Sequence, residues 1–318
     1  MAYKVVLTDH VYPDLEYEKK TLASAGAELV FIDTKDEAEI VKAAADADIV
    51  ITCYANITAN VIKGMEKCKS ISKTGIGVNN IDIRQASAQG IRVLNVPDYC
   101  IEEVSDHAVA LMLGVARRIG TFNNATHKGI WSLEGNRDMI RLRSKILGLL
   151  GFGRTAKLTA QKMKGFGMEI LAYDPYVDAE QCSALGVKKA ELNEVVEKSH
   201  IISINLPLTE ETEGMVNDDF LSRVRDGAIL VNTARGGLIN EPALLKALQS
   251  GKLTGAGLDV LVNEADTSDN PLCRQENAVV TPHAAFCSVE ATQELREKIM
   301  ADVLLVLEGK EPKNQVNR

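Results

Sequence analysis

The chain lacks the features that mark several classes of protein. None of its apolar runs approaches the roughly 20 residues that a membrane-spanning helix needs. Its basic residues never stand in runs longer than two and its formal net charge is -8, which disfavours nucleic acid or an anionic membrane as the main partner. The first ten residues, MAYKVVLTDH, contain neither the basic stretch nor the apolar stretch of a secretory signal.

The cysteines also lack a functional pattern. They are scattered without CxxC spacing, so we expect neither a zinc site, nor any other metal site, nor a disulfide framework. Free cysteine is mostly a small buried hydrophobic residue. A reducing cytoplasm is therefore the expected location. The six positions are Cys53, Cys68, Cys100, Cys182, Cys273 and Cys287.

The 318 residues suggest two domains at about 150 residues each. The first hundred residues alternate apolar strands with helical segments, which predicts a parallel sheet with helices on both faces. The expected helices lie near Leu15–Ala25, near Glu37–Ala45, and within TANVIKGM and IRQASAQ. The expected strands are KVVLTD, ELVFID, DIVITCY, SISKTG and IRVLNVP.

A second alternating series follows and predicts a second doubly wound parallel sheet. Between the two series, residues 101–129 have apolar side chains at helical spacing and no proline, which predicts one long helix. The C-terminal segment from Ser288 reads as an amphipathic helix. A single sheet of eleven strands is the alternative, but open twisted sheets that wide are uncommon. The six strands expected here are ILGLLG, EILAYD, IISINLP, AILVNTAR, GAGLDV and AVVTPH.

The second series opens with a dinucleotide-binding fingerprint. Gly151, Gly153 and Ala156 fit G-x-G-x-x-G/A directly after an apolar strand and at the start of a helix. A glycine turn after a strand is common, but Asp174 also closes the next strand, 23 residues past Gly151. A carboxylate there accepts both ribose hydroxyls and repels a 2′-phosphate, which favours NAD over NADP. Arg154 either contacts the pyrophosphate or is a solvated residue at the helix start.

Three polar side chains follow strands of this second series. Arg235, Glu264 and His283 stand at or just beyond strand ends, where doubly wound sheets bind their ligands. Taken singly, each residue has a plainer explanation. Arg235 could cap a turn, Glu264 could be a solvated acid and His283 could be an ordinary loop residue. Together they suit the reduction of a 2-keto acid, because an arginine holds a carboxylate or keto oxygen and a histidine moves a proton. The glutamate then accepts from the other imidazole nitrogen and fixes its tautomer.

The motifs in order resemble one family over nearly the whole chain: the D-isomer-specific 2-hydroxyacid dehydrogenases. They are GIGVNNID, NVPDYCIEEVSDHAVAL, GLLGFGR, AYDP, INLPLTEET, NTARGGLIN, GLDVLVNE and TPHAAF. The resemblance implies a Rossmann NAD-binding domain, residues 101–286, inserted into a discontinuous flavodoxin-like substrate domain, residues 1–100 plus 287–318. It also implies hinges near Pro97–Glu102 and His283–Glu290. Closure of the cleft about these hinges would bring the keto acid and the nicotinamide together and expel water.

The resemblance also assigns roles to residues. Arg235, Glu264 and His283 match the catalytic trio of the family, and Asp259 matches the residue that holds the nicotinamide carboxamide. The loop Gly75–Val78 matches the one whose N–H groups bind the substrate carboxylate, although a plain glycine turn is the alternative. The substrate set is Tyr54, Ile76, Gly77 and Arg235. The cofactor set is Gly151, Gly153, Arg154, Thr155, Asp174, Leu206, Pro207, Thr212, Thr233, Ala234 and Asp259.

Some positions depart from the family pattern. Asn205 stands where many members have histidine, and Ala265 replaces the proline that usually follows the catalytic glutamate. Thr52 and Asn56 stand where phosphoglycerate-specific members carry arginine and lysine, which disfavours a phosphorylated substrate. Tyr54 is either a wall of the substrate pocket or a packed core residue.

The leading hypothesis is an NAD-dependent D-2-hydroxyacid dehydrogenase that acts on a small 2-keto or 2-hydroxy acid and forms a homodimer. Trp131 matches a position where some members push an aromatic ring into the neighbouring subunit, although a tryptophan inside the dimer core fits equally well. A 3-phosphoglycerate dehydrogenase is one alternative. An NAD-sensing interaction protein similar to the C-terminal-binding proteins is another, because that branch retains the same trio.

Overall fold

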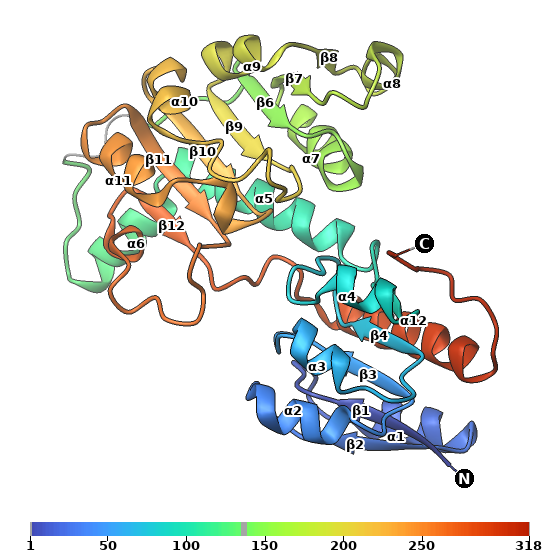
Figure 1. Cartoon of the computed structure of the whole chain (residues 1–318). Coiled ribbons are helices and arrows are strands. Elements are labelled where there is room, and N and C mark those ends of the chain that lie inside the picture. The colour runs from blue at the N-terminus through green and yellow to red at the C-terminus, as the bar shows by residue number, and fades with distance from the viewer. Residues whose placement is uncertain (1, 135–138, 318) are drawn as a thin grey trace. The chain divides into compact units, whose positions relative to one another are not determined.

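The chain folds as two compact units in a computed structural model that describes residues 2–134 and 139–317 (Figure 1). Unit 1 combines Met1–Tyr99 with Ser288–Arg318, and unit 2 is the continuous segment Cys100–Cys287. Each boundary lies one residue from the position expected from the sequence. The second unit is thus inserted into the first.

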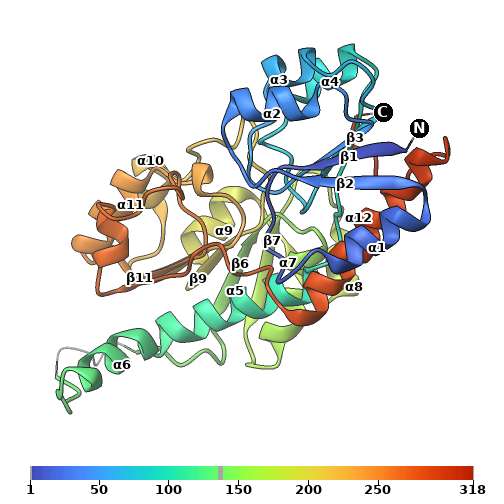
Figure 2. The same cartoon turned by 90° about the horizontal axis from the view of Figure 1, so that it is seen from below.

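Unit 1 is built on a five-stranded parallel sheet in the order β2-β1-β3-β4-β5, the flavodoxin-like order. Helices α1 and α12 cover one face, and α2, α3 and α4 cover the other (Figure 2). The strands are β1 (Tyr3–Leu7), β2 (Ala27–Phe31), β3 (Ile49–Thr52), β4 (Ser70–Lys73) and β5 (Arg92–Leu94). The helices are α1 (Glu16–Ser24), α2 (Glu37–Ala44), α3 (Ala59–Lys63), α4 (Ile83–Ala88) and α12 (Val289–Leu307).

A buried ion pair ties the C-terminal helix to the N-terminal part of unit 1. The guanidinium of Arg296 on α12 donates to both carboxylate oxygens of Glu18 on α1, at 2.8 and 2.7 Å. It also reaches the carboxylate of Asp14 at 3.1 Å. Glu18 is 2% exposed, so its charge needs this partner. These contacts explain how a segment almost 300 residues away in sequence completes unit 1.

Unit 2 is built on a seven-stranded parallel sheet in the order β12-β11-β10-β9-β6-β7-β8, a Rossmann arrangement in which the order reverses between β6 and β9. Its strands are β6 (Ile146–Leu150), β7 (Glu169–Tyr173), β8 (Lys188–Lys189), β9 (Ile201–Ile204), β10 (Ala228–Asn232), β11 (Leu253–Leu258) and β12 (Ala278–Val280). Its helices are α5 (Ile101–Ala116), α6 (Ile119–His127), α7 (Arg154–Lys164), α8 (Ala179–Ala184), α9 (Leu192–Lys198), α10 (Asp218–Arg223) and α11 (Glu241–Gln249), with short 3-10 turns at Gly236–Leu238 and Pro271–Arg274.

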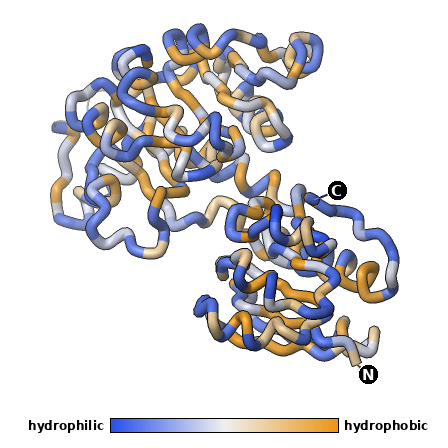
Figure 3. Tube along the Cα trace, in the orientation of Figure 1, coloured by the Kyte–Doolittle hydropathy of each residue, from blue (hydrophilic) through white to orange (hydrophobic). Residues whose placement is uncertain are grey.

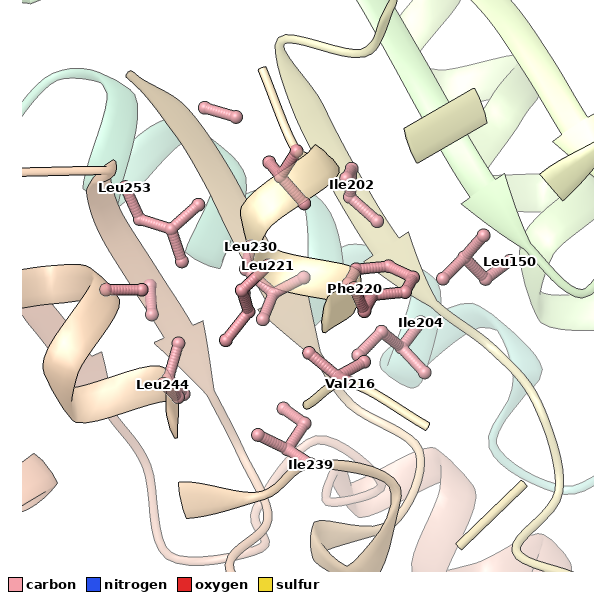
Figure 4. Packing of buried hydrophobic residues seen from close by; sticks show 14 of the residues in the cluster. Leu150, Ile202, Ile204, Val216, Phe220, Leu221, Leu230, Ile239, Leu244 and Leu253 are labelled. Atoms are coloured by element: carbon pink, nitrogen blue, oxygen red, sulfur yellow. The ribbon is translucent and has the colours of Figure 1, made fainter. Parts of the chain in front are cut away.

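Two hydrophobic clusters lie on the two faces of this sheet. One packs α9, α10 and α11 against the strands, with Phe220 at its centre (Figure 4). The other packs α5 and α7 against the opposite face. Apolar residues gather along the strands and polar ones along the outer loops (Figure 3). A sheet buried on both faces explains the continuous apolar runs of the sequence.

The prediction of one long helix over residues 101–129 was wrong. Helix α5 ends at Ala116, and α6 starts at Ile119 after Arg118 adopts a left-handed backbone conformation with φ 51°. The apolar spacing continues across this break, so periodicity does not reveal it. Val115 is buried against the sheet, whereas α6 contains no buried residue.

The sequence also missed three short elements. The two-residue strand β8 makes seven strands where six were expected, because two residues are too few to show a pattern. Helices α8 and α10, of six residues each, were missed for a similar reason. Among the described helices, none is both long and apolar enough to cross a membrane.

Gly148 in the middle of β6 gives a test of the packing in unit 2. A Cβ there would overlap the Ser199 hydroxyl and lie 2.6 Å from Val195 Cγ1 of α9. We expect Gly148→Ala to lower the free energy of unfolding by about 1–3 kcal/mol, as overpacking does. Gly114→Ala in α5 is the matched control, because a Cβ there meets nothing within 4 Å. That control should be neutral or more stable in urea unfolding, and equal stability of both variants would contradict the packing described.

Candidate active site

The fingerprint turn lies at the point where the strand order of unit 2 reverses. Gly151 follows β6 with φ 88°, a conformation that favours glycine. A Cβ on it would lie 2.7 Å from the carbonyl oxygen of Asn205, which follows β9. The loops after β6 and β9 therefore touch there. Ligands of doubly wound sheets bind at this crevice.

The N-terminus of α7 is open to a ligand. Gly153 is its N-cap residue and has no capping side chain, so the first N–H groups of the helix lack that partner. A Cβ on Gly153 would meet no atom within 4 Å. Arg154 is exposed, Thr155 is half-buried and Ala156 is buried beneath the turn. Free N–H groups and a partial positive charge at this end suit a pyrophosphate.

Asp174 stands directly after β7 and is fixed beside the same turn. Its Oδ2 accepts the Phe152 N–H at 2.8 Å, and its Oδ1 accepts the Tyr176 N–H at 2.9 Å. The Gly151 N–H bonds the Tyr173 carbonyl at 2.8 Å, which joins the two loops. A carboxylate held here would accept ribose hydroxyls and repel a 2′-phosphate. The residues present thus fit NAD.

The other expected cofactor residues occupy the loops after β9 and β10. Leu206, Pro207 and Thr212 lie in the first loop, and Thr233 and Ala234 lie in the second. The Thr212 hydroxyl donates to the Pro207 carbonyl at 2.7 Å and so closes its own loop. Because β9 and β10 are the next strands beside β6, both loops emerge at the same edge as the fingerprint.

His283 and Glu264 form a direct pair. Nδ1 of His283 lies 2.7 Å from Oε2 of Glu264, with both side chains partly exposed. An ionised carboxylate only accepts, so the imidazole carries a proton on Nδ1 and leaves Nε2 for a substrate. Burial by itself raises the pKa of Glu264, but the hydrogen bond and charge of His283, the Leu261 N–H and the charge of Arg235 together outweigh it, and the pKa is lowered.

Arg235 is brought to this pair by a close approach of two backbones. Gly236 directly after it packs so tightly that a Cβ would overlap the Leu261 carbonyl group and lie 2.6 Å from the Val262 nitrogen. Residues 261–262 lead directly to Glu264. The charge of Arg235 also contributes to the lowered pKa of Glu264. Unit 2 therefore assembles the three expected catalytic residues, and the glycine after Arg235 permits it.

Glu241 on α11 is a supporting residue that the sequence did not reveal. Its Oε1 accepts the Val262 N–H at 2.7 Å, and its Oε2 accepts from Asn270 Nδ2 at 2.9 Å. It thereby fixes the loop that carries Glu264. No local motif marks such a contact, because its partners lie 21 and 29 residues away.

Asp259 is buried under the turn that carries His283. Its Oδ1 accepts the Thr281 hydroxyl at 2.6 Å and the Ala284 N–H at 2.9 Å, and its Oδ2 accepts the Ala285 N–H at 2.9 Å. Its main-chain carbonyl accepts the His283 N–H at 2.8 Å. The side chain is 1% exposed and both its oxygens have protein donors. The expected contact with the nicotinamide carboxamide stays a prediction, and shaping the His283 turn is a role the sequence missed.

In unit 1, the expected substrate residues lie on loops after β3 and β4. Tyr54 is 42% exposed and Ile76 is 39% exposed, so Tyr54 is not a packed core residue. The buried carboxylate of Asp9, after β1, accepts the N–H groups of Cys53 at 3.0 Å, Tyr54 at 2.6 Å and Ala55 at 3.2 Å. Asp9 thus fixes the loop that carries Tyr54. This is a long-range contact, and no sequence motif predicted it.

The loop after β4 is the one predicted to bind the substrate carboxylate. Gly75 has φ 156°, and its N–H bonds the Lys73 carbonyl at 3.0 Å. Gly77 is half-buried, and the Ile76 carbonyl accepts from Asn95 Nδ2 at 2.7 Å. The main-chain carbonyl of Ile76 is thereby fixed in place. The main-chain N–H groups of Ile76, Gly77 and Val78 are the ones predicted to bind a carboxylate.

Two lysines flank the Tyr54 ring. The ammonium groups of Lys35 and Lys73 lie 5.3 and 5.6 Å from the ring centroid. The side chain of Lys73 also passes Gly75, where a Cβ would lie 3.8 Å from its Cε. The sequence did not reveal this positive site. Within the described ranges, no three histidine, cysteine or acidic side chains gather closely enough to hold a metal ion.

A comparison with protein families agrees with this geometry. Residues 109–285 match the family model described as D-isomer specific 2-hydroxyacid dehydrogenase, NAD binding domain. The match falls inside unit 2 and includes the fingerprint turn, Asp174 and the catalytic trio. Unit 2 is therefore the NAD-binding domain of this family.

Individual relatives extend the match over the rest of the chain. A D-3-phosphoglycerate dehydrogenase of Archaeoglobus fulgidus is 37% identical over 85% of this chain and 51% of its own length. A hydroxypyruvate reductase of Blautia hydrogenotrophica is 34% identical over 99% of both chains. The crystal structure of a D-lactate dehydrogenase from Aquifex aeolicus with NAD and lactic acid superimposes with TM-score 0.89, at 27% identity over 99% of both chains.

The chain spans about half the length of the phosphoglycerate dehydrogenases it matches. The hydroxypyruvate reductase matches from end to end. Family model, relatives and fold agree with the resemblance seen in the motifs. The chain belongs to the D-isomer specific 2-hydroxyacid dehydrogenase family.

Proposed function

We propose that the protein is an NAD(H)-dependent dehydrogenase that interconverts a small 2-keto acid and its D-2-hydroxy acid, mainly as a reductase. The observation that carries the proposal is the 2.7 Å pair of His283 and Glu264 beside Arg235, on an NAD-binding fold. Bound NADH would supply the hydride. The configuration at C2 follows from the family alone.

The side chains divide the remaining work. Glu264 holds the proton on Nδ1 of His283, so the protonated ring gives its Nε2 proton to the keto oxygen as negative charge develops there. In the reverse direction Nε2 takes the proton back. Arg235 offers a planar fork of N–H donors to the substrate carboxylate or to the keto oxygen. In the loop Gly75–Val78, the N–H groups of Ile76, Gly77 and Val78 are the proposed second site for the carboxylate.

The six free cysteines support a cytoplasmic location for this reaction. Four of them are buried or half-buried and none forms a disulfide. Free thiols persist in a reducing compartment. We place the protein in the cytoplasm on this ground.

The histidine role is tested by His283→Gln, with Glu264→Gln as its companion. We expect the first to lower kcat by roughly 10²–10⁴-fold, the usual contribution of a general acid. The second should cost less, because the amide keeps an acceptor but loses the charge. NADH affinity, measured by fluorescence titration, should stay within about twofold in both. Wild-type turnover in His283→Gln would refute the assigned role.

A 3-phosphoglycerate dehydrogenase is the second candidate, because the Lys35 and Lys73 ammonium groups beside Tyr54 suit a second anionic group on the substrate. Against it stand Thr52 and Asn56, which lack the charges of phosphoglycerate-specific members. Thr52 is buried and its hydroxyl donates to the Ala55 carbonyl at 2.9 Å, so it offers nothing to a phosphate.

A substrate panel separates the candidates. NADH oxidation is followed with glyoxylate, pyruvate, hydroxypyruvate and 3-phosphohydroxypyruvate. Should the last be the best substrate, Lys35→Met and Lys73→Met will lower its kcat/KM by about tenfold or more, as expected for charge-assisted contacts. Lys63→Met, an exposed lysine of the same unit, is the control. Reduction of only the unphosphorylated keto acids removes the second candidate. NADH binding without any reduction favours the NAD-sensing interaction protein.

We propose a homodimer formed through α6 and the segment after it. Helix α6 has no buried residue, and four large apolar side chains in this region are exposed. They are Ile119 (58%), Ile130 (54%), Trp131 (93%) and Leu133 (62%). Exposed apolar patches of this kind mark interaction surfaces. A second copy of the chain is the partner that the family pattern implies.

Sedimentation and tryptophan fluorescence test the dimer. Trp131 is the single tryptophan, so its emission reports this surface alone. We expect a dimer with blue-shifted emission that Trp131→Lys converts to monomer. Tyr176→Lys changes an equally exposed aromatic, 94% exposed, and should leave the dimer intact. A wild-type monomer at micromolar concentration would contradict the proposal.

A further inference from the structure

The turn that carries His283 holds it in a costly conformation. His283 has φ 53°, the left-handed region that a non-glycine residue rarely adopts. Such a conformation is strained for a residue with a side chain and persists only where its surroundings impose it. The contacts of Asp259 to Thr281, His283, Ala284 and Ala285 impose it here.

A second histidine, His107, joins the hydrogen-bond network of Asp259 and Thr281. His107 on α5 places Nε2 2.8 Å from the Thr281 hydroxyl and 3.4 Å from Oδ1 of Asp259. The Thr281 hydroxyl has a single proton, which it donates to Asp259 at 2.6 Å. Toward His107 it therefore only accepts, so His107 must carry a proton on Nε2. The hydrogen bonds run in one direction, from His107 to Thr281 to Asp259.

Two acids near His107 on α5 pair with another residue, whereas Asp259 contacts the His107 ring. The neighbouring acids of α5, Glu102 and Asp106, pair with Lys162 of α7 at 2.9 and 2.7 Å. On the other side α5 packs against β11 and β12, where Asp259 and Thr281 follow the strand ends. Asp259 is thus a charged group in contact with the ring, at 3.4 Å from its Nε2.

We propose that His107 is a positioning residue for the acid–base chemistry of His283, acting through Thr281 and Asp259. The inference rests on the proposed function and adds a residue to its site. Without the Nε2–H donor, the Thr281 oxygen loses a partner and the buried carboxylate loses a favourable charge or dipole. The strained turn then relaxes and moves Nε2 of His283. Small displacements of a catalytic group cost up to about 100-fold in rate.

Four variants isolate this role. His107→Phe keeps a planar ring but removes the donor, and His107→Gln keeps an N–H donor at similar reach. Thr281→Val removes the hydroxyl that links the two ends of the network. Thr159→Val is the matched control, because Thr159 on α7 is fully buried and its hydroxyl has no hydrogen-bond partner within the described part of the chain.

The expected results follow from the direction of the network. His107→Phe and Thr281→Val lower kcat by about 10–100-fold, with KM for the keto acid changed much less. The double variant loses little more than the worse single one, because both changes break the same chain of contacts. His107→Gln recovers most of the activity, and Thr159→Val stays near wild type.

A spectroscopic readout makes the test independent of turnover. The Nδ1 proton that His283 shares with Glu264 should give a low-field NMR resonance. We expect it to shift or broaden in His107→Phe and Thr281→Val and to persist in His107→Gln and Thr159→Val. If the wild type reduces no keto acid but this pattern holds, the proposed function fails and the positioning role stands.

Three outcomes overturn the inference. The first is a His107→Phe variant with wild-type kcat and an unchanged resonance. The second is additive loss in the double variant, which would mean that the two residues act separately. The third is a loss of kcat that His107→Gln does not recover and that comes with lower thermal stability, since that identifies a structural role only.

Discussion

A carboxylate taken out of water must be surrounded by hydrogen-bond donors, and the proposed catalytic end of unit 2 is folded around one such group. Asp259 follows β11 and accepts from Thr281, Ala284 and Ala285 after β12. Those donors fix the path of the turn and, with it, the left-handed backbone of His283. The geometry of the proposed proton-transfer site is thus a consequence of satisfying one buried charge.

The same device occurs in unit 1, where Asp9 after β1 binds three N–H groups of the loop after β3. Burial raises the pKa of this carboxyl, but its donors outweigh burial and the pKa is lowered. Each unit therefore uses a buried strand-end aspartate to shape the neighbouring loop that carries proposed site residues. The cofactor end of unit 2 uses the opposite arrangement: a glycine turn and an open helix N-terminus, which offer donors outward to a ligand.

Features that depend on local sequence were predictable, and features that depend on tertiary contacts were not. Gly151 and Gly153 indicate a turn because glycine adopts backbone conformations that other residues avoid. The candidate catalytic residues were recognisable because they follow strands; they are Arg235, Glu264 and His283. His107, Asp9 and Glu241 act on residues far away in sequence, so no local pattern marks them. Likewise, the apolar periodicity did not predict the helix break at Arg118, because periodicity reflects the spacing of apolar residues and not their contact with a sheet.

In the proposed reaction, His283 is held by Glu264 and by the Asp259 turn and gives its Nε2 proton to the keto oxygen of the substrate. Arg235 binds the carboxylate of the same substrate. A crystal structure of the protein with NADH and oxamate, an unreactive analogue of a 2-keto acid, tests this claim most directly. We expect Nε2 of His283 within about 3.2 Å of the amide carbonyl oxygen of oxamate, which takes the place of the keto oxygen, and the Arg235 guanidinium on the oxamate oxygens. Oxamate bound away from both side chains, with His283 still paired to Glu264, would contradict the account.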